Sequence, residues 1–321
     1  MKRRVSLTLV STAAVLLSVY GGHADDKLTA LTYQDVPRGF LGELAARTTE
    51  PGSKGVGVPF YLPQSAKDGI TYGIDISHYT FSNGASINWD ELGSKKVSFV
   101  YIKASEGVSY YDGTFEGSWH SLGAMANGPV RGAYHFLRAL DDPREQAVTF
   151  VNILKEKSDY KVGRDLPPVV DLEWDCKRDA KGRPIYKNGR CAHDNWSDLT
   201  PDEITSRVSS FLAQLKKELN VDALVYTSNV WWNERHLNDA SDKTFLAANK
   251  LWIADYTKKS QKTSNPPIPA GLQSIMWQFT DNGKLTDTCN PSDKNSHCTD
   301  TNAVLMNFAD FKRALGIADQ Q

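Results

Sequence analysis

The chain lacks an excess of charge of either sign. Its 321 residues carry 37 Lys and Arg against 38 Asp and Glu, which gives a formal net charge of -1 at pH 7. Removing residues 1–24 would take away three positive charges and no acids, so the net charge would fall from -1 to -4. Neither net charge gives the protein an electrostatic attraction for a polyanion. We therefore expect no nucleic acid among the partners of this protein.

Glycine-rich phosphate loops are also missing. No strand-like segment is followed by G-x-G-x-x-G or by a Walker sequence, and the glycines after Ser82 match neither pattern. No internal repeat is visible. The sequence therefore disfavours a nucleotide-dependent enzyme and a repeat protein, and we expect no cofactor.

The chain has little long apolar sequence beyond one run at residues 5–20. Three basic residues at positions 2–4 precede this run, and the small residues Gly22 and Ala24 follow it. This order is typical of a signal peptide, which we assign to residues 1–24. The run is short for a membrane span, so an uncleaved anchor is the weaker alternative. We expect a secreted or periplasmic protein that leaves the membrane after cleavage.

Cysteine is scarce, and its spacing is informative. Two cysteines lie close together in the middle of the chain and two lie near its end; they are Cys176, Cys191, Cys289 and Cys298. In an exported protein this spacing predicts two local disulfides. Zinc is the alternative interpretation, but neither pair has Cys-x-x-Cys spacing. We expect no metal.

From Thr71 onward, strand-like segments alternate with helical patterns. Residues 25–69 show no sustained period and are expected to form an N-terminal extension. The predicted strands span residues 72–77, 98–103, 131–136, 168–173, 224–227, 251–255 and 274–279, and the clearest helices span 142–157 and 201–219. A last helix is expected after Asn307, ending near Gly316. This alternation predicts an α/β fold with a parallel sheet, either a barrel or an open doubly wound sheet.

Polar residues recur where the predicted strands end, which favours the barrel because its carboxyl-terminal rim collects the chemistry. They are Asp75, Glu106, His135, Asp171, Glu173, Asp255 and Gln278. Asp171 and Glu173 close the apolar segment Pro-Pro-Val-Val-Asp-Leu-Glu-Trp. Residues two apart in a strand share a face, with Cα atoms about 6–7 Å apart. This separation suits the two carboxyl groups of a retaining glycosidase, although a bare Asp-x-Glu is usually a solvated strand face or a helix cap.

Several segments together resemble glycoside hydrolase family 25, the Chalaropsis-type lysozymes, over about residues 70–315. The resemblance rests on an ordered series: residues 72–78 (Tyr-Gly-Ile-Asp-Ile-Ser-His), Ile87 to Trp89, 99–107, Asp112 with Phe115, 132–136, Gln146 to Phe150, Asp171 with Glu173, 251–256, and 277–279. The resemblance implies a flattened TIM-like barrel with fewer helices than a full (β/α)8 barrel. It also implies an N-acetylmuramidase that cleaves the β-1,4 bond between N-acetylmuramic acid and N-acetylglucosamine in peptidoglycan glycan strands.

The resemblance and the chemistry together suggest catalytic roles for four acids. Glu173 is the expected proton donor, because neighbouring carboxylates resist its ionisation. Asp171 would either attack the anomeric carbon or orient the 2-acetamido group of the sugar, and both readings imply retention. Asp75 and Asp255, carried over by resemblance, would fix these groups and stabilise positive charge; the alternative is a structural acid at a strand end.

Aromatic residues beside the predicted strands are candidates for contact with sugar. The chain holds eight Trp and thirteen Tyr, and the substrate-binding candidates are Tyr134, Trp252, Tyr256, Trp277 and Gln278. Plain core packing is the alternative for each aromatic. His135 lies on the opposite strand face from Tyr134 and is expected to be buried and hydrogen-bonded. Lys103 and Glu106 are expected to pair near the rim.

Two segments depart from the family pattern and are expected to be disulfide loop insertions in the 70–318 barrel, near residues 174–198 and 284–301. The first is basic and begins just after Glu173, so we expect it at the catalytic rim, where it suits acidic wall groups. A solvated surface loop is the alternative.

Two other functions remain open: a catalytically weak glycan-binding protein on the same barrel, and a hydrolase of another acetamido-sugar polymer such as chitin. We expect a monomer.

Overall fold

The computed structural model describes residues 69–81, 84–92, 97–187, 190–243, 250–257, 260, 266–269, 271–283, 285–286 and 298–318. The predicted signal peptide and residues 25–68 of the predicted extension lie outside this range. Cys289 and most of the second predicted insertion also lie outside it. In the described part, no helix is long and apolar enough to cross a membrane.

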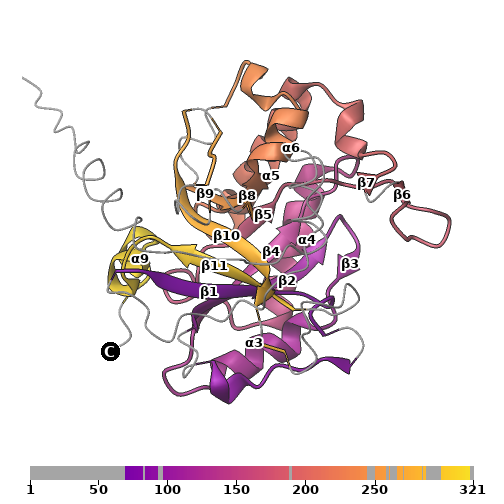
Figure 1. Ribbon diagram of the computed structural model, residues 1–321. Helices are drawn as coiled ribbons and strands as arrows, with labels where there is room; N and C mark the ends of the chain where they lie inside the picture. The colour runs from indigo at the N-terminus through magenta and orange to yellow at the C-terminus, as the bar shows by residue number, and fades with distance from the viewer. Residues whose placement is uncertain are drawn as a thin grey trace, which may run out of the picture.

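The strands form a closed eight-stranded barrel (Figure 1). It closes because β1 pairs with β11 on one side and with β2 on the other. Around the barrel the strands run β1 (Thr71–Ile76), β2 (Val97–Glu106), β4 (Val130–Phe136), β5 (Val169–Asp171), β8 (Leu224–Ser228), β9 (Lys250–Ala254), β10 (Ser274–Gly283) and β11 (Thr299–Val304). The short β3 (Tyr110–Tyr111) folds back against the end of β2. The predicted TIM-like barrel is confirmed, as are all seven predicted strands.

The eighth strand, β11, is absent from the prediction. It runs antiparallel to both of its neighbours, β1 and β10. Its sequence, Thr-Asp-Thr-Asn-Ala-Val, is polar and lacks the apolar alternation that identifies a strand. Its threonines and its asparagine are nevertheless fully buried, because their polar groups find partners inside the fold. Tertiary contacts therefore make this segment a strand.

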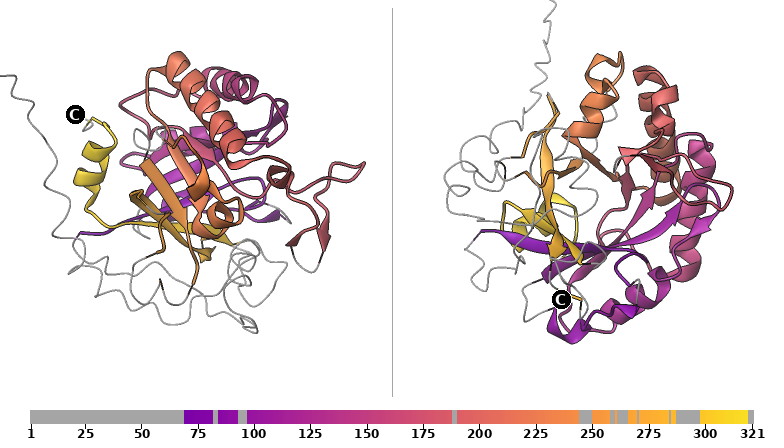
Figure 2. Two further views of the ribbon diagram at one scale, coloured as in Figure 1. Left: turned by 90° about the horizontal axis from the view of Figure 1, so that it is seen from above. Right: turned by 45° about the vertical axis from the view of Figure 1, so that its right-hand side comes forward.

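Five α-helices occur among the described residues: α3 (Phe115–Gly123), α4 (Pro143–Lys157), α5 (Pro201–Leu219), α6 (Asn229–Glu234) and α9 (Phe308–Ala314). Helices α4 and α5 pack side by side on the outside of the barrel (Figure 2). Both begin where the sequence predicts: Asp142 caps α4, and Thr200 forms a capping box with Glu203 at the start of α5. The predicted last helix is α9, and Gly316 follows it with a φ of 69°.

Alternate residues of each strand divide between two cores. Outward residues such as Ile74, Ile102 and Ile253 pack with the helices in a large outer cluster. Inward residues such as Phe99, Leu224 and Met276 form a smaller cluster inside the barrel. Burial on both faces explains why the parallel strands read as almost continuous apolar runs.

The lower half of the barrel interior is apolar and tightly filled. Phe311 from α9 closes this end, with its ring 5.2 Å from that of Phe99. A Cβ at Gly73 would lie 2.3 Å from the Phe99 ring, and one at Gly132 would lie 2.4 Å from the Tyr101 ring. Only glycine therefore leaves room for these two large side chains. This apolar half of the barrel interior packs beneath the polar residues Asp75, Gln278 and Asn302 at the other end.

The predicted insertion after β5 is a hairpin held by a disulfide. Cys176 and Cys191 are bonded, as the sequence predicts, with Cα atoms 5.1 Å apart. Strands β6 (Tyr186–Lys187) and β7 (Arg190–Cys191) form a separate two-stranded sheet that projects from the barrel (Figure 1). The hairpin contacts the barrel through Arg178, whose guanidinium lies 2.7 Å from a carboxylate oxygen of Glu106.

Candidate functional site

Carboxyl groups from four places around the barrel form a cluster at its carboxyl-terminal end. Asp75 comes from β1, Asp171 from the end of β5 and Glu173 from the segment just after it, and Asp300 comes from β11. We call these residues the four-carboxyl cluster. Asp300 belongs to it because β11 pairs with β1, so that Asp300 and Asp75 are partners in the ladder. Burial raises the pKa of Asp171, Glu173 and Asp300, and the charge of Asp75 adds to the rise in all three.

Asp75 is held by two amide groups. The side-chain nitrogens of Gln278 and Asn302 donate to the same carboxylate oxygen of Asp75, at 2.9 Å and 2.8 Å. Asp300 is hydrogen-bonded to Asp75 as well. Burial raises the pKa of Asp75 to about 6, against the opposing effect of these hydrogen bonds. Asp75 is therefore a positioned acid, fixed from two neighbouring strands.

The two amides that hold Asp75 are themselves oriented by aromatic residues. The Gln278 oxygen accepts hydrogen bonds from the hydroxyl groups of Tyr226, at 2.8 Å, and Tyr256. The Asn302 oxygen accepts from the Trp252 indole at 2.9 Å. Because each amide oxygen is engaged, each amide nitrogen must face Asp75.

Asp171 has no comparable support. It is 7% exposed, and its Oδ1 is buried without a hydrogen-bond partner among the described residues. Burial and then the charge of Glu173 raise the pKa of Asp171 well above its usual value, although Lys103 opposes the shift. An unpartnered buried carboxyl oxygen is costly and is often reserved for a ligand.

Glu173 is half-buried, whereas Asp75 and Asp171 are almost fully buried. Burial raises the pKa of Glu173 to about 7; Lys103 opposes this shift, and the charges of Asp75 and Asp194 add to it. A carboxylic acid that stays protonated near neutral pH is suited to donate a proton.

A compact ion group lies beside the cluster. The Lys103 ammonium donates to Glu106 at 2.8 Å, which confirms the predicted pair. Arg138 and Arg178 also contact the Glu106 carboxylate. Burial would raise the pKa of Glu106, but these cations lower it to about 2. Glu106 therefore stays ionised and fixes Lys103. The charge of Lys103 in turn lowers the pKa of both Asp171 and Glu173.

Asp255, the fourth acid in the sequence-based assignment, lies at the end of β9. Its carboxylate accepts from the backbone nitrogen of Thr257 at 3.2 Å and from the Thr257 hydroxyl at 3.1 Å. Its backbone oxygen accepts from the Trp277 indole at 2.8 Å. These contacts fix the local chain, and the catalytic role of Asp255 stays a prediction. Sequence reasoning did not identify Asp300, because the strand that carries it was not recognised.

The predicted sugar-contact residues differ in how much surface they offer. Tyr134 is half-buried on the inner face of β4, and the charges of Asp75 and Asp171 add to the burial that raises its pKa well above 10. Trp252 is 2% exposed and packs against the Tyr226 and Tyr101 rings inside the barrel. Trp277 is also 2% exposed, in the outer core.

Tyr256 and Gln278 are almost fully buried and support Asp75, as described above. Among the four aromatic residues predicted to contact sugar, Tyr134 is therefore the one that keeps exposed surface. Three tyrosines at the rim were not singled out from the sequence: Tyr79, Tyr110 and Tyr186 are 53%, 39% and 43% exposed. The signal that could have revealed them is their position in the segments that follow the strands.

His135 is fully buried, as predicted. One ring nitrogen lies 2.8 Å from the Ser105 hydroxyl and the other 3.2 Å from the Gln146 side-chain oxygen. Burial lowers the pKa of His135 to about 3, so it stays neutral and structural. Among the described residues, no group of three or more His, Cys, Asp or Glu side chains could hold a metal ion.

Known proteins share this architecture. The family described as "Glycosyl hydrolases family 25" matches residues 74–288. Lysozyme M1 from Streptomyces globisporus is 28% identical over 233 residues, which cover 70% of this chain and 66% of that protein. The N,O-diacetylmuramidase of Chalaropsis sp is 26% identical over 220 residues, which cover 65% of this chain and 87% of that protein.

Solved structures agree with the sequence relatives. The crystal structure of the bacterial lysozyme from Streptomyces coelicolor matches with a TM-score of 0.58 and 25% sequence identity, covering 78% of this chain and 99% of that chain. The family match includes Asp75, Asp171, Glu173 and Asp255 and ends before Asp300. With this match over most of its barrel, the chain belongs to glycosyl hydrolase family 25.

Proposed function

We propose that this protein is an N-acetylmuramidase that cleaves the β-1,4 bond between N-acetylmuramic acid and N-acetylglucosamine in peptidoglycan, with retention at the anomeric carbon. The observation that carries the proposal is the pair formed by Glu173, whose pKa is raised to about 7, and Asp171, which ends β5 two residues before it. Family membership and the muramidase relatives support the substrate class.

Glu173 donates its proton to the glycosidic oxygen as the bond to the anomeric carbon breaks. The sugar then develops positive charge, which the ionised carboxyls of the cluster stabilise. Asp75 is the best placed for this electrostatic role, because two amide donors fix it in one orientation. After the first step, Glu173 is a carboxylate and accepts a proton from the incoming water.

Asp171 supplies the second function, in one of two ways. It attacks the anomeric carbon directly, or it orients the 2-acetamido group so that the sugar oxygen attacks. Its unpartnered Oδ1 is available for either contact. Both routes pass through two displacements and therefore retain configuration. Incubation with a fluorinated sugar substrate that keeps its 2-acetamido group distinguishes them, because only direct attack leaves a covalent adduct on Asp171.

Export to the wall is part of the proposal. The basic residues, apolar run and small residues of segment 1–24 support a cleaved signal peptide, and the disulfide between Cys176 and Cys191 suits an oxidising compartment. Sequencing the amino terminus of the protein recovered outside the cytoplasm tests this part. A chain that begins near Asp25 supports it, and an intact Met1 in a membrane fraction contradicts it.

The activity is tested by release of reducing ends from purified peptidoglycan, with chitin as the comparison polymer. We expect new N-acetylmuramic acid reducing ends from peptidoglycan and little release from chitin. Equal release from both polymers would favour a broader acetamido-sugar hydrolase. Binding to peptidoglycan without release would favour a catalytically weak glycan-binding protein. The anomeric configuration of the first product, followed by NMR, tests retention.

A further inference from the structure

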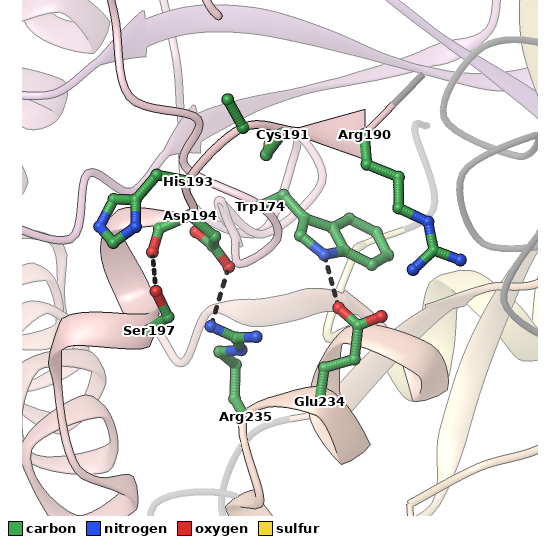
Figure 3. Close-up of a pocket in the computed structure, with 9 residues that line it drawn as sticks. Trp174, Arg190, Cys191, His193, Asp194, Ser197, Glu234 and Arg235 are labelled. Atoms are coloured by element: carbon green, nitrogen blue, oxygen red, sulfur yellow. Dashed lines mark hydrogen bonds and ion pairs between the residues drawn. The ribbon is translucent and has the colours of Figure 1, made fainter. Parts of the chain in front are cut away.

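A polar cavity is lined by Trp174, which directly follows Glu173 of the four-carboxyl cluster and packs against the outer core. It measures about 380 Å³ and is formed where the disulfide insertion meets the end of α6 (Figure 3). Its walls include Trp174, Arg190, His193, Asp194, Glu234 and Arg235. None of these side chains has a role in the chemistry proposed above, apart from the effect of the Asp194 charge on Glu173.

The acidic groups of this cavity are already engaged. The Trp174 indole donates to Glu234 at 2.8 Å, and the Arg235 guanidinium lies 3.4 Å from Asp194 (Figure 3). Asp194 also accepts from the Trp231 indole at 3.3 Å. Both carboxylates are therefore matched by donors in the wall.

The basic groups are only partly matched. Arg235 has a buried Nε without a hydrogen-bond partner among the described residues. Arg190 is exposed, and no described residue pairs with its guanidinium. Figure 3 shows the side chains of Arg190 and Glu234 beside the Trp174 indole, while Arg235 lies next to Asp194. The cavity thus offers, beside the Trp174 ring, one arginine that has no ion-pair partner among the described residues.

The cavity wall and the proposed catalytic acid lie on one short segment of the chain. Trp174 directly follows Glu173 in the chain. Along an extended segment neighbouring side chains face opposite ways, so this segment separates the cavity from the cluster. The charge of Asp194 in the cavity wall also acts on Glu173. To reach the cavity, a substituent of a glycan bound at Glu173 must therefore extend past this segment.

We propose that this cavity binds a carboxylate carried by the muramoyl substituent of the glycan, with Arg190 as its principal donor and Trp174 as its apolar wall. The inference rests on the proposed function. An arginine fork is suited to a carboxylate because it can donate two parallel hydrogen bonds. The carboxylate comes either from the lactyl group itself or from the peptide attached to it.

The test compares Arg190→Ala with the native protein on soluble peptidoglycan fragments. Loss of a charge-assisted contact should raise KM roughly tenfold, with kcat within about twofold. Arg183→Ala is the matched control: it removes one charge from the same hairpin, but Arg183 pairs with Asp179 and does not line the cavity. We expect Arg183→Ala to behave like the native protein.

Chemically modified substrates identify the ligand. When all carboxyl groups of the fragments are amidated, the KM difference between Arg190→Ala and the native protein should fall below about twofold. Fragments stripped of peptide keep only the lactyl carboxylate, so a penalty that survives there assigns the contact to the lactyl group. A penalty that disappears there assigns it to the peptide.

The inference is overturned if Arg190→Ala leaves KM unchanged on native fragments, or if its penalty is as large on amidated fragments. Either result leaves the proposed muramidase activity intact. If the native protein itself releases no reducing ends from peptidoglycan, by contrast, the proposed function is overturned.

Discussion

Asp75 and Asp171 are both inward-facing acids at strand ends and both almost fully buried, yet their surroundings differ. Asp75 receives two amide hydrogen bonds on one oxygen, and the amides are held in turn by two tyrosines and a tryptophan. Asp171 has an oxygen with no partner among the described residues. The pKa of Asp75 is raised only to about 6, whereas that of Asp171 is raised well above its usual value.

The comparison separates two ways of using a buried acid. On the β10, β11 and β1 side of the barrel, hydrogen bonds favour the ionised form and fix a negative charge. On the β5 side, burial and mutual repulsion keep a proton on the pair of Asp171 and Glu173. A glycosidase needs both a fixed charge and a transferable proton. The predictions below test this division, from the largest expected effect to the smallest.

Glu173→Gln should have the largest effect on catalysis. The amide keeps the shape of the side chain and loses only the transferable proton, so activity on peptidoglycan should fall about 10²–10⁴-fold while folding is preserved. Initial rates of reducing-end release and a thermal melt check this result. Activity above a tenth of the native rate would remove Glu173 from the role of proton donor.

Asp171→Asn should also abolish most of the activity, and it should affect stability in a pH-dependent way. Because the folded-state pKa of Asp171 is raised, its ionisation costs stability as pH rises above the usual value of 3.8. The amide removes that cost. We expect Tm to rise by a few degrees at pH 8 and to be unchanged at pH 3. A lower Tm at pH 8 would contradict the unfavourable environment of Asp171.

Asp300→Asn should impair activity more than Asp255→Asn. Asp300 is hydrogen-bonded to Asp75 and its pKa is raised well above the usual range by burial and by the charge of Asp75, whereas the Asp255 carboxylate accepts hydrogen bonds from Thr257 in its own segment. We expect a loss of roughly tenfold or more for Asp300→Asn. Thr301→Val, on the outward face of β11, is the control. A larger loss for Asp255→Asn would restore the assignment made from sequence.

Removing the disulfide should have the smallest effect on the barrel. The chain-entropy estimate for a loop of this length is about 3 kcal/mol, but the hairpin projects from the barrel and its opening need not unfold it. Cys176→Ser with Cys191→Ser should therefore raise KM on peptidoglycan while shifting Tm by only a few degrees. Unchanged KM together with a large drop in Tm would contradict a role in substrate binding.

The sequence predicted the parallel part of the barrel well, because its strands are buried on both faces and its longer helices carry clear caps. Asp142, Thr200 and Pro201 mark helix starts that local chemistry alone determines. The pair Asp171 and Glu173 was found for the same reason: an apolar strand followed by acids is a local signal.

The support of Asp75 was not predictable in this way. It depends on Asn302 and Asp300, which lie 227 and 225 positions away in the chain and reach Asp75 only because the polar strand β11 closes the barrel. Trp252 and Trp277 show a second limit. Both look like sugar platforms in the sequence, but whether an aromatic in a strand faces a cleft or a core is decided by packing.

The central claim is that Glu173 keeps its proton near neutral pH. The direct measurement is an NMR titration of the protein with ¹³C-labelled glutamate carboxyl groups, in which Glu173→Gln assigns the Glu173 resonance. We predict a midpoint near pH 7 and a parallel fall in activity as pH rises through the same range, because the deprotonated acid cannot protonate the leaving oxygen. A midpoint at or below 4.5, the usual value for glutamate, would contradict the account.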